Sequence, residues 1–366
     1  MRVRDVMAAV DRWAPPALAY SWDKAGLSTG NPDSKVTKIL VALTVTTETF
    51  EAALAAKAQM IVSHHPLIWE PLTTLRSDDA QARLCLNVAN KKIACYSAHT
   101  TLDVVPQGVN HVLAERLGLT KVSPLFPVHH AQQLKLVTFV PESHLAAVRD
   151  AVSAAGAGVI GEYTHCSFSA PGTGTFKPGS GASPYTGRRH RVNQEPELRF
   201  ETLVPKARAA EVVQAMKEAH PYEEVAYDLV MLDGSDPAVS LGLRGELARA
   251  VTLSTFASRV RGALEIKHLR VAGDMKSKVR SVAVLGGSGG ASAAGVPRDV
   301  DVYVTGDVKY HEALDARERG LNIIDAGHHG TEKWIVPALA GYLKKNLKGA
   351  RVTAYNEPDP FRVVTK

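Results

Sequence analysis

Residues 39–66 read ILVALTVTTETFEAALAAKAQMIVSHHP, and this stretch decides the fold class. Two short apolar runs, at 39–43 and 60–62, flank a segment in which Phe50, Leu54 and the neighbouring alanines form a helical stripe. Short apolar runs that alternate with helical patterns are typical of a parallel β-sheet covered by helices. The stretch therefore predicts a βαβ unit.

The same alternation continues further along the chain. The next apolar run is IACYS at 93–97, and the segment between Pro106 and Gly118 has the start, the stripe and the stop of a helix. Four more runs, SVAVL, VYVT, NIID and RVTAY, follow much later, at 281–285, 302–305, 322–325 and 351–355. We therefore expect the two outer pieces of the chain to form one layered α/β unit.

The pattern between these outer pieces is different. Strand-like runs such as LKLVTFV and ELRFETLV are separated by two helical segments in the order strand, helix, strand, strand, helix, strand. This βαββαβ order is typical of a ferredoxin-like domain. We predict an inserted ferredoxin-like domain at residues 126–235 and a discontinuous α/β core formed by residues 1–125 and 236–366.

Composition places the chain among ordinary globular proteins. Its 366 residues exceed what one hydrophobic core usually organises, which agrees with two domains. The mean hydropathy is −0.08, and no apolar stretch approaches the roughly 18 residues of a membrane helix. Asp5, Asp11 and Arg12 interrupt the apolar segment that a secretion signal would need. We therefore expect a cytoplasmic protein with no membrane contact.

Charge and cysteine content exclude several other classes of protein. The formal net charge is +6, but the basic residues are scattered, so a solvated surface is favoured over nucleic-acid binding. Cys85, Cys95 and Cys166 form neither a paired framework nor a close-spaced cluster, which argues against disulfides and a cysteine zinc site. The sequence has no G-x-x-x-x-G-K-[ST] phosphate-binding run and no evident Cys–His pairing, and we disfavour catalysis by a nucleophilic side chain.

Three histidine doublets stand out, at 64–65, 129–130 and 328–329, and the first and last follow predicted strands. Ligands bind at the carboxyl ends of strands in open α/β sheets. Successive side chains on an extended backbone diverge, so His64 and His65 either meet at the rim of one small site or serve different metal ions. A hydrogen-bonded pair of strand-end histidines is the alternative.

Two carboxylates complete a possible metal site. His328 and Glu332 are four residues apart, so on a helix they lie on the same face. Asp103 follows another strand. Taken alone, Asp103 is best interpreted as a helix cap, and Glu332 as one member of a surface ion pair. Together, three imidazoles and two carboxylates suit two ions bridged by a carboxylate better than one ion; the predicted ligands are His64, His65, Asp103, His328 and Glu332.

Other polar residues near the strand ends allow two interpretations each. His99 is either a sixth ligand or, as we favour, an imidazole that positions water beside the ligands. Asp307, four residues before His311, either orients a ligating histidine or begins a helix. The GGSGG run at 286–290 is either a phosphate cradle or, as we favour, a tight turn. The segment HPYEEVAYDLV at 220–230 is a loop over a site, a subunit contact or, as we favour, the edge strand of the ferredoxin-like sheet.

At this point the motifs resemble a known family, the dinuclear metal-centre hexameric proteins, also called GTP cyclohydrolase 1 type 2 homologues or NGG-interacting-factor-three-like proteins. The resemblance covers nearly the whole chain and includes the long bacterial form with an inserted domain. The segments that carry it are SHHPLIW, SAHTTLDVVPQGVNHVLAERLGL, GGSGG, TGDVKYHEALDA and AGHHGTE in the outer pieces, and GEYTHCSF, GTGTFKP and HPYEE in the insert.

The resemblance implies a pair of divalent ions held by the same five residues, inside a toroidal homohexamer of three-layer α/β/α subunits. Mixed imidazole and carboxylate donors accept Zn, Fe, Mn, Co or Ni. Two departures are visible. Relatives carry an aspartate after the strand at 39–43, where this chain has Thr44, and they often carry an aromatic residue in place of His329, which here offers a further possible ligand.

Two functions from different classes follow. The first is a metal-dependent hydrolase that, as the resemblance implies, opens the ring of a purine nucleotide such as GTP, with His99 positioning water. The second is a regulatory or scaffold hexamer without turnover, which binds a ligand or a protein partner through the inserted domain. We expect a small-molecule substrate, in particular a nucleotide, and neither a nucleic-acid nor a membrane partner.

Overall fold

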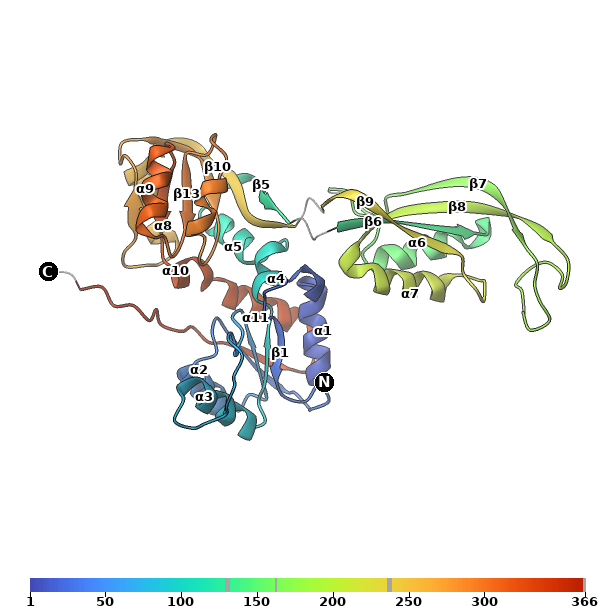
Figure 1. Cartoon of the computed structure of the whole chain (residues 1–366), viewed down its shortest axis with the longest axis horizontal. Coiled ribbons are helices and arrows are strands. Elements are labelled where there is room, and N and C mark those ends of the chain that lie inside the picture. Colours follow the sequence, from blue (N-terminus) through green and yellow to red (C-terminus); the bar gives the residue numbers. More distant parts are fainter. Residues whose placement is uncertain (129–131, 162, 236–238, 365–366) are drawn as a thin grey trace. The chain divides into compact units, whose positions relative to one another are not determined.

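The computed structural model describes residues 1–128, 132–161, 163–235 and 239–364 of a mixed α/β protein with several sheets (Figure 1). The chain divides into two compact units, Met1–Pro127 with Val239–Lys366, and Val128–Ala238. In the described part of the chain, no helix combines the length and the apolar character needed to cross a bilayer.

The first sheet of the larger unit carries the stretch that decides the fold class. Its strands are β1 (Gly26–Thr29), β2 (Lys38–Ala42), β3 (Met60–Ser63), β4 (Ala94–Ser97) and β15 (Arg351–Ala354), in the order β1-β4-β3-β2-β15. All pairs are parallel except β1 with β4. Ser63 pairs with Ser97, so β3 and β4 end level with each other and place the residues that follow them at one edge.

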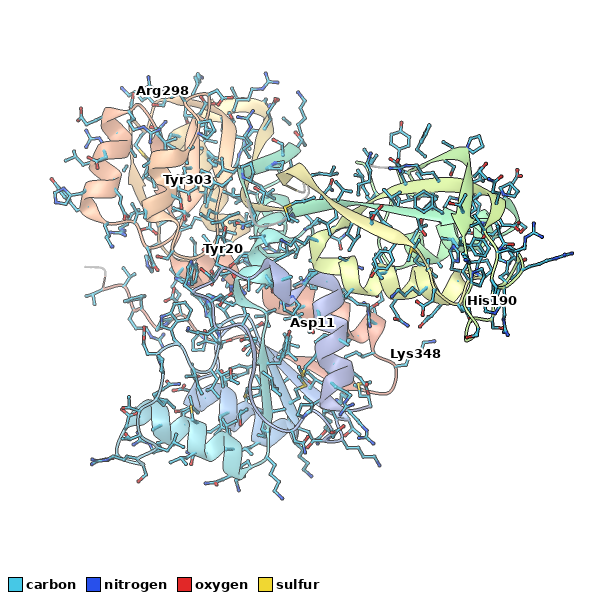
Figure 2. The ribbon with its side chains drawn as sticks, turned by 45° about the vertical axis from the view of Figure 1, so that its right-hand side comes forward. Asp11, Tyr20, His190, Arg298, Tyr303 and Lys348 are labelled. Carbon is cyan, nitrogen blue, oxygen red and sulfur yellow. The ribbon has the colours of Figure 1, made fainter. Side chains whose placement is uncertain are left out.

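Helices cover both faces of this sheet. Phe50 of α2 (Thr47–Ala56) and Val88 of α3 (Ala80–Asn90) pack with alternate strand residues such as Leu40 and Ile61. The intervening strand residues, which point to the other face, are buried toward α1 (Val3–Trp13) and α11 (Ile335–Asn346). There the Tyr96 hydroxyl donates a hydrogen bond to Asp11 of α1 (Figure 2).

The second sheet of the larger unit has six strands in the order β11-β14-β13-β12-β10-β5. These are β5 (Thr120–Pro127), β10 (Ser240–Thr252), β11 (Arg270–Ala272), β12 (Lys278–Val284), β13 (Val302–Thr305) and β14 (Asn322–Asp325). The central strands β12, β13 and β14 are parallel, and Thr305 pairs with Asp325, so their carboxyl ends also lie at one edge. On one face pack α5 (Val109–Arg116) and α8 (Leu253–Ala263), and on the other η4 (Gly290–Gly295) and α9 (Tyr310–Glu318).

The larger unit is thus built on two sheets, which the strand pattern alone does not reveal. Strands from both sheets have the same apolar character, and pairing between distant strands leaves no local signal. The last strand, β15, lies beside β2 in the first sheet, whereas β12, β13 and β14 belong to the second. Two short helices, α4 (His99–Val104) and α10 (His328–Glu332), follow strands of different sheets and carry predicted site residues.

The smaller unit contains one antiparallel sheet with two helices. Its elements are β6 (Gln132–Val140), α6 (Leu145–Ala154), β7 (Ser167–Phe176), β8 (Asn193–Pro205), α7 (Ala209–Ala219) and β9 (Tyr227–Ser235). The sheet order is β7-β8-β6-β9. Leu136 and Phe200 of the sheet pack with Val148 of α6 and Met216 of α7 in one core. Short 3-10 turns precede both helices, η2 (Glu142–His144) before α6 and η3 (Lys206–Arg208) before α7, whereas η1 (Pro16–Leu18) in the larger unit lies between α1 and β1.

Candidate metal centre

The histidine doublet after β3 lies at the edge of the first sheet. The backbone N–H groups of His64 and His65 donate to Ala42 and Leu43, so the β2–β3 pairing continues through the doublet. The His64 side chain is 1% exposed and that of His65 is 20% exposed, and their ring centroids are 4.8 Å apart. The two imidazoles therefore share one site instead of diverging into separate ones.

Glu332 lies at the centre of the predicted ligands. Its Oε2 atom is 3.0 Å from Nε2 of His65 and 3.0 Å from Nε2 of His328, one turn earlier on α10. Its Oε1 atom is 3.7 Å from Nε2 of His64, which is in turn 3.6 Å from Oδ1 of Asp103. The structure thus brings all five residues together, and the two oxygens of Glu332 face two different sets of donors.

The residues present fit a divalent cation. Buried polar atoms are normally hydrogen-bonded, yet within the described residues His64 Nε2 and Asp103 Oδ1 are buried and have no hydrogen-bond partner. The ligand atoms of His64, His65 and Glu332 lie within 4.8 Å of one another. A cation among them would satisfy the buried atoms, and imidazole and carboxylate donors are those that first-row divalent metals accept.

The protonation states also suit a metal centre. Burial lowers the pKa of His64 to about 4, so its imidazole is neutral and free to ligate. Burial works against ionisation of Glu332, but the neighbouring imidazoles of His64, His328 and His65 hold its pKa well below the usual range. Burial and the nearby Glu332 carboxylate raise the pKa of Asp103 well above its usual value. A metal ion would remove this repulsion between the two carboxylates.

Two hydrogen bonds orient the imidazoles of His65 and His328. The Nδ1 atoms of His65 and His328 lie 2.9 Å from Thr44 Oγ1 and 2.7 Å from Asp307 Oδ2, which leaves both Nε2 atoms facing Glu332. Thr44, the departure noted in the sequence, thus supplies a polar contact to the site. Asp307 orients a predicted ligand, as one of its two interpretations proposed, whereas His311 is exposed. Such orienting bonds fix the ring and raise ligand basicity.

His99 lies beside the cluster. Its ring centroid is 5.5 Å from that of His64 and 5.9 Å from that of His65, and its Nδ1 atom is 2.6 Å from Asp23 Oδ1. Burial would raise the pKa of Asp23, but its hydrogen bonds with His99 and Thr100 lower it to about 2. Asp23 was missed in the sequence, since a single aspartate in a loop far from His99 has no motif or periodicity to mark it.

The glycine run at 286–290 packs against the cluster. Gly287 has φ +70°, and a Cβ atom added to it would lie 2.1 Å from Oε1 of Glu332. Its N–H donates to Thr331 Oγ1 at 3.0 Å, so the run adjoins α10. The run is therefore a close backbone contact at the candidate centre, for which a side chain leaves no room.

The C-terminal segment also reaches the cluster, although no motif in it predicts this contact. Glu357 accepts a hydrogen bond from the backbone N–H of Thr44 at 2.7 Å. His329 donates through Nε2 to the Glu357 carbonyl oxygen at 2.9 Å, so this atom is occupied by the backbone and does not serve as a further ligand. The doublet at 129–130 lies outside the described residues.

The raised pKa of His328 predicts a pH-dependent metal affinity. Burial would lower this pKa, but Glu332 and Asp307 together raise it to about 9. Below that pH the metal-free imidazole carries a proton that a metal must displace, so affinity should rise about tenfold per pH unit for each displaced proton and level off above the pKa. A competitive chelator titration measures this. Asp307→Asn should move the plateau to lower pH, and a pH-independent affinity would contradict the assignment.

The fold and the cluster together define a class: an α/β protein with a buried centre of imidazoles and carboxylates suited to divalent metal. The model of one protein family, described as Duf34/NIF3 (NGG1p interacting factor 3), matches residues 1–360. The chain belongs to this family.

Several known proteins are similar to the chain over most of its length. A protein of Halalkalibacterium halodurans named GTP cyclohydrolase 1 type 2 homolog is 39% identical over 98% of each chain. A protein of Bacillus subtilis with the same name is 38% identical over 89% of this chain and 88% of its own. The crystal structure of a Bacillus cereus protein related to NIF3 superposes with a TM-score of 0.89 at 39% identity, covering 100% of this chain and 99% of the other.

Proposed function

We propose that the chain is a divalent-metal-dependent hydrolase with a dinuclear centre. The observation that carries this proposal is the position of Glu332, whose two carboxylate oxygens face two separate groups of donors, His64 with Asp103 and His65 with His328. A carboxylate so placed can bridge two cations, and five donors supply more ligands than one tetrahedral ion takes from a protein. Such donors accept Zn, Fe, Mn, Co or Ni, and the metal available in the cell decides which of them is bound.

The reaction we propose is hydrolysis of a carbon–nitrogen bond, specifically ring opening of a purine nucleotide such as GTP. The names of the relatives from Halalkalibacterium halodurans and Bacillus subtilis support this choice of substrate. When bound, divalent ions lower the pKa of a water molecule and polarise the bond to be cleaved. The chain's own residues supply and orient the ligands. The buried carboxylate of Glu332 stays ionised, and hydrogen bonds with Thr44 and Asp307 orient the imidazoles of His65 and His328.

His99 is the residue proposed to move protons. Its Nδ1–H is held by the ionised Asp23, which leaves Nε2 as the atom that can take a proton from water or return one to the product. Asp23 is fully buried and also accepts from the backbone N–H of Thr100, so the imidazole is firmly oriented. The side chain of His99 is 15% exposed, which leaves it in reach of solvent and substrate.

Replacing His99 by glutamine is expected to lower kcat by about 10²- to 10⁴-fold, the usual contribution of a positioned acid or base. Metal content should not change, because His99 is not among the residues that hold the metal in this proposal. Steady-state kinetics together with elemental analysis of the purified variant check both statements. A variant with full activity, or one that loses metal, would show that His99 has a different role.

The finer features of the architecture are part of the same proposal. The strand order β7-β8-β6-β9 with both helices on one face supports a ferredoxin-like insert, and helices on both faces of each large sheet support three-layer α/β/α packing. A cytoplasmic homohexamer, which the resemblance of the sequence motifs implies, is likewise part of the proposal.

A second candidate function is a metal-binding regulatory hexamer in which the smaller unit binds a ligand or a protein partner. The observation that favours it is a cavity of about 650 Å³ inside that unit. Aromatic rings and charged groups meet in its wall, among them Phe139, Glu197, Arg199, Tyr185 and Tyr222. Cavities of this size and mixed lining are typical of small-molecule sites.

One comparison separates the two functions. GTP and a panel of other phosphorylated and cyclic-amide compounds are incubated with metal-reconstituted wild-type protein and with the His64→Ala, Glu332→Ala double variant. The hydrolase proposal expects metal-dependent turnover by the wild type alone, and about two metal ions per chain by elemental analysis of the wild type. Absence of metal-dependent turnover across the panel would favour the regulatory function, and unchanged metal content in the double variant would refute the ligand set.

A further inference from the structure

Two exposed tryptophans flank the candidate metal centre. Trp22 is 53% exposed and Trp69 is 47% exposed, although tryptophan is highly buried on average in folded proteins. Both rings contact His99 edge to face, with centroid distances of 6.3 Å for Trp22 and 5.4 Å for Trp69. Since His99 adjoins the histidine doublet, the two indoles form an apolar wall next to the place where the chemistry is proposed to occur.

The two indoles form a corner and are held in place. Their centroids are 6.0 Å apart and their planes meet at 70°. Tyr20, labelled in Figure 2, stacks on Trp22 with a centroid distance of 5.5 Å and an interplanar angle of 13°. The next residue, Asp23, is fixed by His99 and Thr100. Rigid aromatic groups lose little conformational entropy when a ligand packs on them, which makes the corner a preorganised surface.

We propose that Trp22 and Trp69 are specificity-determining residues that receive a planar aromatic heterocycle of the substrate. The proposal rests on the hydrolase function and adds the residues that select the substrate class. Stacking on an aromatic side chain suits any base because every base has a flat π-face. A flat ring stacked on one indole would meet the second indole edge to face, and both stacked and edge-to-face arrangements are favourable for aromatic groups.

The alternative occupant of this corner is a second copy of the chain. The contacts favour the small heterocycle, because both indoles touch His99, and a protein surface packed on them would cover the imidazole that we propose to exchange protons with substrate. A stacked heterocycle, in contrast, would bring its own reacting bond next to His99.

The test measures binding separately from turnover. Rapid-filtration binding of radiolabelled GTP measures its affinity for the full-length, metal-reconstituted chain before product accumulates, and radiolabelled inorganic triphosphate serves as the probe without a ring. Trp22→Ala and Trp69→Ala should each weaken GTP binding by about tenfold, or about 1.4 kcal/mol, without weakening triphosphate binding. Trp22→Phe and Trp69→Phe should retain most of the affinity, because phenylalanine keeps a stacking face.

Trp13→Phe is the matched control. Trp13 packs on Tyr342 with a centroid distance of 4.6 Å and donates its indole N–H to the Pro106 carbonyl, so its replacement should not change GTP binding. The proposal is overturned if both alanine variants bind GTP as the wild type does, or if they lose GTP and triphosphate equally. It is also overturned if their oligomeric mass changes while GTP binding does not, which would assign the corner to a second copy.

Failure of this inference is distinguishable from failure of the proposed function. Binding that depends on both tryptophans, without any turnover, would leave the stacking corner standing and refute the hydrolase. Metal-dependent turnover that does not depend on either tryptophan would support the hydrolase and refute the stacking corner. If the wild type does not bind GTP, the inference is refuted whatever the outcome of the turnover panel.

Discussion

Replacing Glu332 by glutamine is expected to prevent the purified protein from binding divalent metal. The Glu332 side chain is only 5% exposed. Its Oε2 atom faces the imidazoles of His65 and His328, and its Oε1 atom faces the imidazole of His64. Glutamine has the same shape but lacks the charge, and its amide N–H₂ group would point at atoms that must face a cation. The metal affinity should therefore fall by more than the roughly 10- to 100-fold that accompanies loss of a group that only orients a ligand.

Elemental analysis and metal titration of the wild type, Glu332→Gln and a control check this result. Glu211→Gln is a suitable control, because Glu211 is an exposed glutamate on α7 in the other compact unit, and the same chemical change there should not alter metal content. Circular dichroism distinguishes loss of metal from loss of fold. Wild-type metal content in Glu332→Gln would contradict the central place we give this carboxylate.

Local elements of the fold could be predicted because their signals are local. The apolar runs at 39–43 and 60–62 correspond to β2 and β3, and the stripe around Phe50 corresponds to α2, in which the Thr46 side chain caps the first turn. Each of these predictions depends only on side chains that are close to one another in the sequence, within a single strand or within one or two helical turns. The choice between one sheet and two depends instead on which distant strands pair, and this leaves no trace in a local pattern.

The same distinction applies to the site. The proximity of the five candidate ligands could be predicted because each follows a strand or shares a helix turn with another, and strand ends in α/β proteins converge. Their orienting partners were harder to predict. The sequence allowed two roles for Asp307, orienting a histidine or beginning a helix. No sequence pattern marked Asp23, because an aspartate that bonds to a histidine far away in the chain looks the same in the sequence as a solvated aspartate. The exposure of Trp22 and Trp69 likewise depends on tertiary packing.

Gly287→Ala is expected to damage the metal centre although Gly287 provides no ligand. The backbone there has φ +70°, which costs a residue with a Cβ atom about 1 kcal/mol or more. The added Cβ atom would lie 2.1 Å from Glu332 Oε1 and 3.3 Å from His328 Nε2, so the glycine run or α10 has to move. Because metal sites tolerate only small displacements of their ligands, we expect metal affinity to fall by at least about tenfold.

Gly262→Ala is the matched control for this substitution. Gly262 lies near the end of α8, its added Cβ atom would meet nothing within 4 Å, and alanine is the better helix former. This variant should keep its metal affinity and unfold at the same temperature as the wild type or slightly higher. Metal titration and thermal unfolding of both variants decide the matter: if Gly287→Ala binds metal as Gly262→Ala does, the glycine run does not shape the centre and its close contact with Glu332 has no functional consequence.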